Sequence, residues 1–150
     1  MYTKTTLKLT LAGATKVLEG VLKEAKSRAQ EISVAVVDAG GHLIAFARTD
    51  AAELQTIAIA ENKARSAAFA GIPTGKTSKA GNEGSDFHSL AITLAAGPDK
   101  VVKVQGGLPI IVQGQCIGGV GVSGAAHIDA EIAQTGLDSL EVEARGLPVG

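Results

Sequence analysis

Three histidines and one lysine are the residues of this chain whose types and surroundings could do chemistry. His88 closely follows Asp86, and His127 stands two residues before Asp129, at the start of the last predicted helix. Imidazole can coordinate a metal or carry a proton near neutral pH. No histidine forms a close His/Cys pair with zinc-finger spacing, so the sequence gives little support to a structural zinc site. A weaker metal site remains open, built from His88 or His127 with Asp86 or Asp129.

Lys63 lies in an alanine-rich stretch from Ala52 to Ala70 that predicts a helix. Two interpretations of this lysine remain open. Glu61 and Arg65 are spaced i, i+4, which is typical of a solvated helix face. Alternatively, Lys63 shares a face with Ile59, points into a groove and holds the carboxylate of a ligand.

The segment from Gly106 to Gly124 reads GGLPIIVQGQCIGGVGVSG, an apolar hairpin pattern rich in glycine. Glycine weakens a strand, so a glycine-rich strand marks a place where something approaches the backbone closely. We therefore expect this hairpin to line a groove. Its candidate ligand-binding residues, besides Lys63 and His88, are Gly106, Gly107, Gly121 and Ser123. Ser123 has no base beside it in the sequence that would make it a nucleophile.

Two short motifs imitate nucleotide-binding loops. Residues 119–124 match G-x-G-x-x-G, but too little chain follows for a full dinucleotide-binding unit. Residues 70–77, AGIPTGKT, resemble a phosphate-binding loop, yet a helix precedes them where that loop needs a buried strand. Neither motif predicts a nucleotide site.

Composition narrows the class of protein. The 150 residues suit one domain, and a single cysteine excludes a disulfide framework within the chain. A net charge of −1 and four scattered aromatic residues argue against nucleic acid as a partner. No stretch approaches the length of a membrane span. These features predict a soluble, cytoplasmic protein that does not bind membranes.

Hydrophobic periodicity predicts the elements that position these residues. We expect helices from Leu11, over Ala52 to Ala70, in a short piece from Phe87 to Ala96, and from about Ile128 to Glu143. Five strands are expected, with turns at Asp38-Ala39-Gly40-Gly41 and at Gln113-Gly114-Gln115. The expected strands cover 32–37, 42–48, 101–105, 108–112 and 116–123. This order predicts an α+β fold with a five-stranded, largely antiparallel sheet. Residues 74–98 are a candidate mobile or ligand-covering loop.

Several segments together resemble the GlcG and HbpS family of haem-binding or haem-degrading-type proteins, which is also similar to the PduO C-terminal domain. They are SVAVVDAGGHLIAFARTD, AENKARSAAF, the glycine-rich hairpin and the following Asp129. The resemblance covers about Leu9 to Leu140 and implies one such domain over residues 1–150 with a short C-terminal tail. It also implies a profilin-like fold and a symmetric homo-oligomer, in a family whose members often occur beside catabolic operons.

The family also implies haem as a possible cofactor. A haem iron ligand is normally His, Met, Cys or Tyr. Of the histidines, His88 and His127 are the candidates, and His88 is preferred because it lies in the irregular segment. Lys63, Lys76 or Lys79 would meet the propionates.

Three functional hypotheses follow. The first is a small haem- or tetrapyrrole-binding protein. The second is a cofactor-independent catabolic enzyme, an isomerase, lyase or hydratase, acting on a small carboxylated or aromatic molecule, with unknown catalytic residues. The third is an accessory structural oligomer, in which the glycine-rich strand and the alanine-rich helix serve subunit packing. Whether the protein is an enzyme stays open at this point.

Overall fold

Four strands form one antiparallel sheet in the order β2-β1-β4-β3 in the computed structural model, which describes residues 1–146, with side chains through residue 140. The strands are β1 (Ser33–Asp38), β2 (Leu43–Arg48), β3 (Gly107–Val112) and β4 (Gln115–Ser123). The helices are α1 (Leu11–Ser27), α2 (Thr56–Ala70), α3 (Asp86–Ala96) and α4 (Asp129–Gly146), with a short 3₁₀ turn η1 (Ala126–Ile128) before α4.

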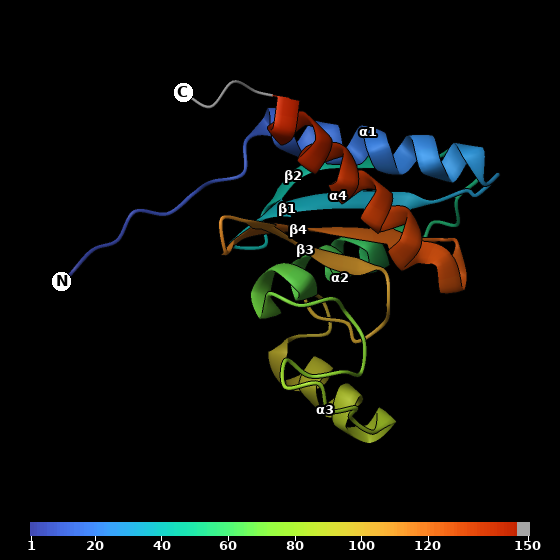
Figure 1. The fold of residues 1–150 in the computed structure, drawn as a ribbon. Helices are drawn as coiled ribbons and strands as arrows, with labels where there is room; N and C mark the ends of the chain where they lie inside the picture. The colour runs from blue at the N-terminus through green and yellow to red at the C-terminus, as the bar shows by residue number, and fades with distance from the viewer. Residues whose placement is uncertain (147–150) are drawn as a thin grey trace.

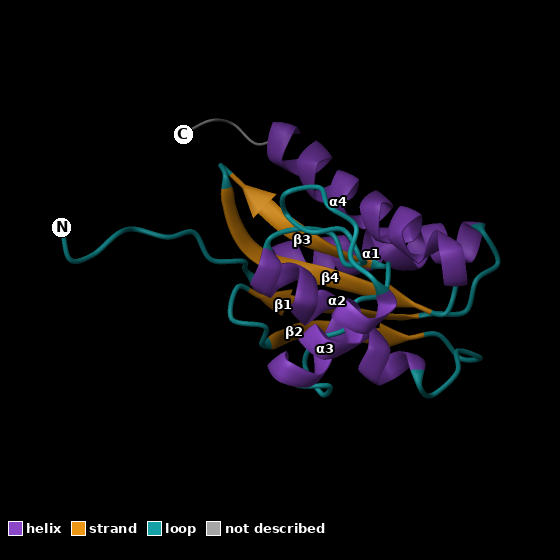
Figure 2. Cartoon of the chain, turned by 90° about the horizontal axis from the view of Figure 1, so that it is seen from below, coloured by secondary structure: helices purple, strands orange, loops and turns teal. Residues whose placement is uncertain are grey.

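The helices cover the two faces of the sheet unequally. In Figure 1, α1 and α4 lie together on one face and α2 lies on the other, with α3 beyond α2 and away from the strands. The main apolar core fills the space between the sheet and the α1/α4 pair. A smaller cluster, built largely of alanine, joins the sheet to α2. The view from below in Figure 2 shows α2 lying across the strands.

A glycine stripe in β4 lets α2 approach the sheet. A Cβ atom on Gly119 would collide with the carbonyl oxygen of Ala64, and one on Gly121 with that of Ala60. Any larger residue would therefore push the helix off the sheet. The close approach that the glycines predicted is confirmed, but here the approaching group is the backbone of this chain's own α2.

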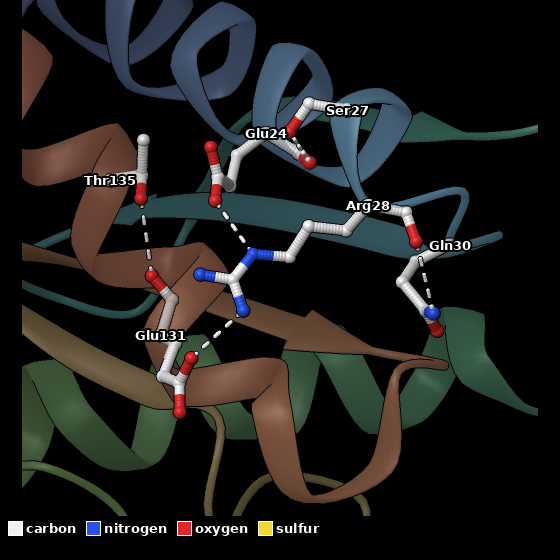
Figure 3. Close-up of polar contacts among 6 residues, drawn as sticks. All are labelled: Glu24, Ser27, Arg28, Gln30, Glu131 and Thr135. Carbon is white, nitrogen blue, oxygen red and sulfur yellow. Dashed lines mark hydrogen bonds and ion pairs between the residues drawn. The ribbon is translucent and has the colours of Figure 1, made fainter.

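Arg28, just after α1, ties that helix to the start of α4. Its guanidinium donates to Glu24 at 2.7 Å and to Glu131 at 2.9 Å, and Figure 3 shows these contacts side by side. The Glu24 and Glu131 carboxylates raise the pKa of Arg28 above its usual range. Because Glu131 lies in the first turn of α4, the contact helps to hold that turn against α1.

The predicted elements are confirmed apart from one strand and some boundaries. Thr10 caps α1 by accepting from the Gly13 N–H, as a threonine before a helix commonly does. Both hairpins form, and a short helix does follow Ser85. The alanine-rich helix begins at Thr56, not Ala52. The last residues of the predicted tail, 147–150, lie outside the described residues.

The prediction of five strands is wrong: the sheet formed by the described residues has four. Residues 101–105 were expected to be a strand and are irregular. The reason is that Val102 donates its backbone N–H to the Ser66 hydroxyl of α2 at 2.8 Å, so this segment follows the helix rather than a strand. Gly106 then turns with a φ of +124° into β3. The profilin-like relationship stays a prediction.

No helix among the described residues is long and apolar enough to cross a membrane.

Candidate functional site

A buried ion pair between Lys63 and Asp129 lies where α2 meets the end of the sheet. Lys63 Nζ is 2.9 Å from Asp129 Oδ2, and the two residues are 2% and 3% exposed. The same ammonium donates to the Val122 carbonyl oxygen at 2.9 Å. Two buried opposite charges that share hydrogen bonds offset much of the cost of removing each from water. The pair thus joins three elements: α2, β4 and α4.

The turn after β4 places the carboxylate. Asp129 Oδ1 accepts the Ala125 N–H at 2.7 Å, so both carboxylate oxygens are engaged. Gly106 passes close beside the pair: a Cβ atom there would lie 2.7 Å from Lys63 Nζ and 2.6 Å from the Val122 carbonyl oxygen. A glycine is required at this position because any side chain would displace the ammonium or the strand.

Lys63 and Asp129 line an open cleft of about 550 Å³, called the Lys63 cleft below. Ser123, at the end of β4, also lines it, as do Glu31 and Glu53. The pKa of Glu31 is held below its usual range by hydrogen bonds from the Thr49 side chain and the Ala51 N–H. The lining of the cleft therefore combines two negatively charged glutamates with an ion pair whose two charges neutralise each other.

A second cleft of about 540 Å³, called the His127 cleft below, lies beside the first. Val104 and Ala126 line both clefts. The other residues of the His127 cleft include His127, two lysines and one glutamate, at positions Lys76, Lys103 and Glu83. Lys76 pairs with Asp86, the first residue of α3, and this carboxylate raises the pKa of Lys76. The cleft thus combines an imidazole with positive charge.

Comparison with known families decides the relationship. Residues 9–138 match the family described as haem degrading protein HbpS-like. The chain belongs to this family. The sequence resemblance is thereby confirmed, and the HbpS-like match spans the sheet together with the residues that line both clefts.

Relatives of this HbpS-like chain agree with that assignment. Protein GlcG of Escherichia coli K12 is 34% identical over 82% of this chain and 85% of its own length. The crystal structure of Klebsiella pneumoniae ORFY has a TM-score of 0.80 at 31% identity and covers 94% of this chain and 97% of its own. The crystal structure of a PduOC:haem complex has a TM-score of 0.76 at 26% identity, covering 96% and 98%.

The HbpS-like fold brings together one group of the predicted site residues. Gly106, Gly107 and Gly121 all approach Lys63 or its backbone, and Ser123 lines the same cleft as the Lys63 side chain. These three glycines leave room for Lys63 and its backbone to pack closely against the strands. The carboxylate expected to meet Lys63 is supplied by Asp129 of the same chain. The expected Glu61–Arg65 pair also forms, with 3.8 Å between oxygen and nitrogen.

The two candidate iron ligands are placed differently. His127 lies in η1 and lines the His127 cleft, whereas His88 is exposed on α3 and does not line either cleft. The described residues contain no cluster of three or more His, Cys, Asp or Glu side chains that could hold a metal ion. Among the described residues, neither His88 nor His127 therefore belongs, together with an aspartate, to a cluster of three or more such side chains.

Sequence reasoning missed four charged lining residues. Lys103 was assigned to a strand, and Glu31, Glu53 and Glu83 were not singled out. No local signal marks them, because they come from separate loops. Asp129 was singled out, yet its pairing with Lys63 joins positions 66 residues apart. Only the antiparallel sheet and the packing of α2 bring them together.

Proposed function

We propose that this chain binds haem or a related tetrapyrrole in the His127 cleft. The observation that carries the proposal is that an imidazole and two lysines line one cleft in a chain of the HbpS-like family. A haem iron accepts an imidazole ligand, and its two propionates need cationic partners. The donor set of the cleft fits both requirements. The haem complex of PduOC, a structural neighbour, supports the choice of ligand.

In this proposal His127 would coordinate the iron, and Lys76 and Lys103 would pair with the propionates. Bound haem would supply a redox-active iron to the site. Asp86 keeps the Lys76 side chain beside the cleft. His127 follows Gly124, whose φ is +127°, so the backbone turns sharply before the histidine. These residues orient and hold the ligand.

A second copy of this chain would complete the site. Helix α3 has no buried residue, and Phe87 is 81% exposed, with Leu90 and Leu94 also exposed. An exposed apolar helix marks an interaction surface. The apolar side chains that line the His127 cleft are those of Val104 and Ala126, whereas a porphyrin is largely apolar. We infer that α3 of one copy covers apolar surface on another, in a homo-oligomer.

The test of the haem proposal is a haemin titration followed by absorbance. We expect a shifted Soret band that saturates near one equivalent per chain, and we expect His127→Ala to lose that shift. His88→Ala is the matched control, because it removes an imidazole from the same region but outside the cleft. A shift that survives in His127→Ala and disappears in His88→Ala would transfer the ligand role to His88. No shift in the unmodified protein would overturn haem binding.

The assembly is tested separately by light scattering after size-exclusion chromatography. Leu90→Glu places a charge on the apolar face of α3, and we expect it to reduce the mass toward one chain. Glu19→Lys, at an exposed position of α1, is the control for a changed surface charge. A monomeric unmodified protein would overturn the assembly proposal and leave the haem titration to be judged alone.

The enzyme hypothesis has less support from the geometry. It relied on Lys63 to hold a substrate carboxylate, and that ammonium is already paired with Asp129 and the Val122 carbonyl oxygen. The third hypothesis used the glycine strand and the alanine-rich helix for subunit packing. In this structure these two elements pack against each other within one chain.

A further inference from the structure

A third hollow, called the α3 pocket below, lies where the end of α2 and the loop after it meet α3. Its volume is about 250 Å³. Gly75 and Lys103 line both this pocket and the His127 cleft, and Val102 lines both this pocket and the Lys63 cleft. The side chains of its lining are mostly apolar: Phe69, Ile72, Pro73, Ile92, Val101 and Val102. A concave, mainly apolar surface with few polar groups is the usual form of a small-molecule site.

Hydrogen bonds within the chain shape the α3 pocket. The Ser66 hydroxyl of α2 accepts the Val102 N–H at 2.8 Å, which holds the segment before β3 against the helix. The side-chain amide of Asn62 donates to the Pro98 carbonyl oxygen at 3.2 Å, just after the end of α3. Helix α3 lies beyond α2 in Figure 1, and this contact ties its C-terminal end back to α2. The pocket is therefore formed by a single chain without a ligand, as small-molecule sites usually are.

Among the described residues that line the α3 pocket, Lys103 alone is charged. The two hydroxyl side chains of the lining are already engaged, because Ser66 accepts the Val102 N–H and Thr74 accepts the Gly107 N–H at 2.8 Å. Lys103 is half-buried and forms no ion pair with a described carboxylate. Its alkyl stem can lie along apolar surface while its ammonium donates up to three hydrogen bonds. The polar group that the pocket offers to a ligand is therefore a cation.

The pocket uses a different face of α3 from the one proposed above to contact another copy. Successive residues of a helix are about 100° apart, so Phe87, Leu90 and Leu94 share one side of α3. Ile92 and Ala96 fall on roughly the opposite side, and both line the pocket. A second copy of the chain on the outer face would therefore leave the pocket open to a ligand.

We propose that the α3 pocket binds a small carboxylic acid with a hydrocarbon body of about one ring and a short chain. A cavity of about 150 Å³ holds one benzene molecule, so the larger α3 pocket has room for a ring with a chain. The hydrocarbon part contacts the apolar lining, and the carboxylate accepts a charge-assisted hydrogen bond from the Lys103 ammonium. An amine would meet that ammonium with no carboxylate in the lining. The site goes beyond the haem proposal and does not depend on it, although both ligands would use Lys103.

Three probes test this ligand class in the full chain without haemin: hydrocinnamate, hydrocinnamyl alcohol and propionate. The alcohol keeps the ring and lacks the charge, whereas propionate keeps the carboxylate and lacks the ring. Calorimetry and amide NMR follow each titration. We expect hydrocinnamate to bind at least about tenfold more tightly than either of the others, a difference of about 1.4 kcal/mol, with amide shifts at Ile72 and Val102. Equal affinity of the acid and the alcohol, or no shift at these amides, would overturn the proposal. The Soret band plays no part here, so either proposal can fail alone.

Variants then locate the binding. Lys103→Gln removes the charge and Ala96→Leu fills part of the pocket, and we expect each to weaken hydrocinnamate binding about tenfold or more. Lys100→Gln and Ala95→Leu are the matched controls, because both positions are exposed and outside the lining, and they should leave the affinity unchanged. Equal weakening in the controls would refute the site. If Ala96→Leu reduces the mass of the assembly and leaves the hydrocinnamate affinity unchanged, the pocket is a contact between copies and the proposal is overturned.

Discussion

The Lys63 cleft and the His127 cleft are similar in volume, share Val104 and Ala126, and carry opposite charge. The difference comes from the elements that build them. The Lys63 cleft has a floor of packed secondary structure, where α2, β4 and the start of α4 meet at a buried ion pair. The His127 cleft is formed by exposed turns and irregular segments. One fold therefore places two clefts of opposite formal charge side by side.

Because one cleft is lined by buried residues and the other by exposed ones, we expect substitutions in the first to change the stability of the fold and substitutions in the second to change ligand affinity. Residues on the floor of the Lys63 cleft belong to the packed interior, so changing them disturbs the fold. His127 and Lys76 are more exposed, so changing them should alter a ligand's affinity and little else. Substitutions in the two clefts can test this contrast directly.

The largest expected effect is the loss of the buried pair. Lys63→Met keeps most of the length of the side chain but leaves the Asp129 carboxylate buried without its cation. We expect the free energy of unfolding to fall by about 3–5 kcal/mol, because an uncompensated buried charge is strongly destabilising. Urea unfolding measures this change.

The partner variant and a control complete that test. Asp129→Asn in the Lys63→Met background should recover part of the loss, since the remaining charge is then gone. His127→Ala, in the other cleft, should change stability by less than about 0.5 kcal/mol. If the free energy of unfolding of Lys63→Met fell by less than about 1 kcal/mol, the result would contradict the view that the Lys63–Asp129 pair stabilises the junction of α2, β4 and α4.

A smaller effect is expected at the glycine stripe. Gly121→Ala adds a methyl group that would collide with the Ala60 carbonyl oxygen, so α2 must shift away from β4. We expect a destabilisation of about 1–3 kcal/mol, typical of overpacking. Gly84→Ala is the matched control near the His127 cleft, because its new Cβ would meet the edge of the movable His88 ring at 3.1 Å. Equal thermal stability of both variants would contradict the close approach of α2.

The smallest effect concerns the contact between Asp86 and Lys76. The hydrogen bond from Lys76 lowers the pKa of Asp86 below its ordinary value of 3.8. Since the folded pKa is depressed, the pair stabilises the fold above pH 3.8, and this contribution is lost as the pH falls through the folded pKa.

Carbon NMR of the Asp86 carboxyl group measures that titration. Lys76→Met should move the midpoint upward toward 3.8, whereas Glu83→Gln should leave it in place. A midpoint of 3.8 or higher in the unmodified chain would remove the evidence that Lys76 is held at the His127 cleft. The effect on stability should be small, because both side chains are exposed to solvent.

Local patterns were enough to predict most elements of the fold. The 3.6-residue period with Thr10 before it predicted α1, and the turn residues predicted both hairpins. They failed at residues 101–105, where alternating apolar residues look like a strand. There the Ser66 hydroxyl accepts the backbone N–H of Val102, which in a strand would have bonded to a neighbouring strand. A local pattern cannot show which distant partner receives a hydrogen bond.

The candidate sites were predictable only in part. Lys63, Ser123 and His127 were identified as residue types capable of chemistry, and each lines a cleft. Their partners, including Glu31 and Lys103, come from distant loops and were not foreseen.

By itself, the sequence determined the α+β class, the family and the need for something to approach the glycine-rich strand closely, since these depend on residue type and short-range spacing. Only the tertiary structure decided that helix α2 is the group that approaches the glycine-rich strand, and that Asp129 forms the ion pair with the Lys63 ammonium. Both outcomes depend on contacts between residues far apart in the chain. Their energies arise from packing and desolvation, which exist only once the sheet and its helices have assembled.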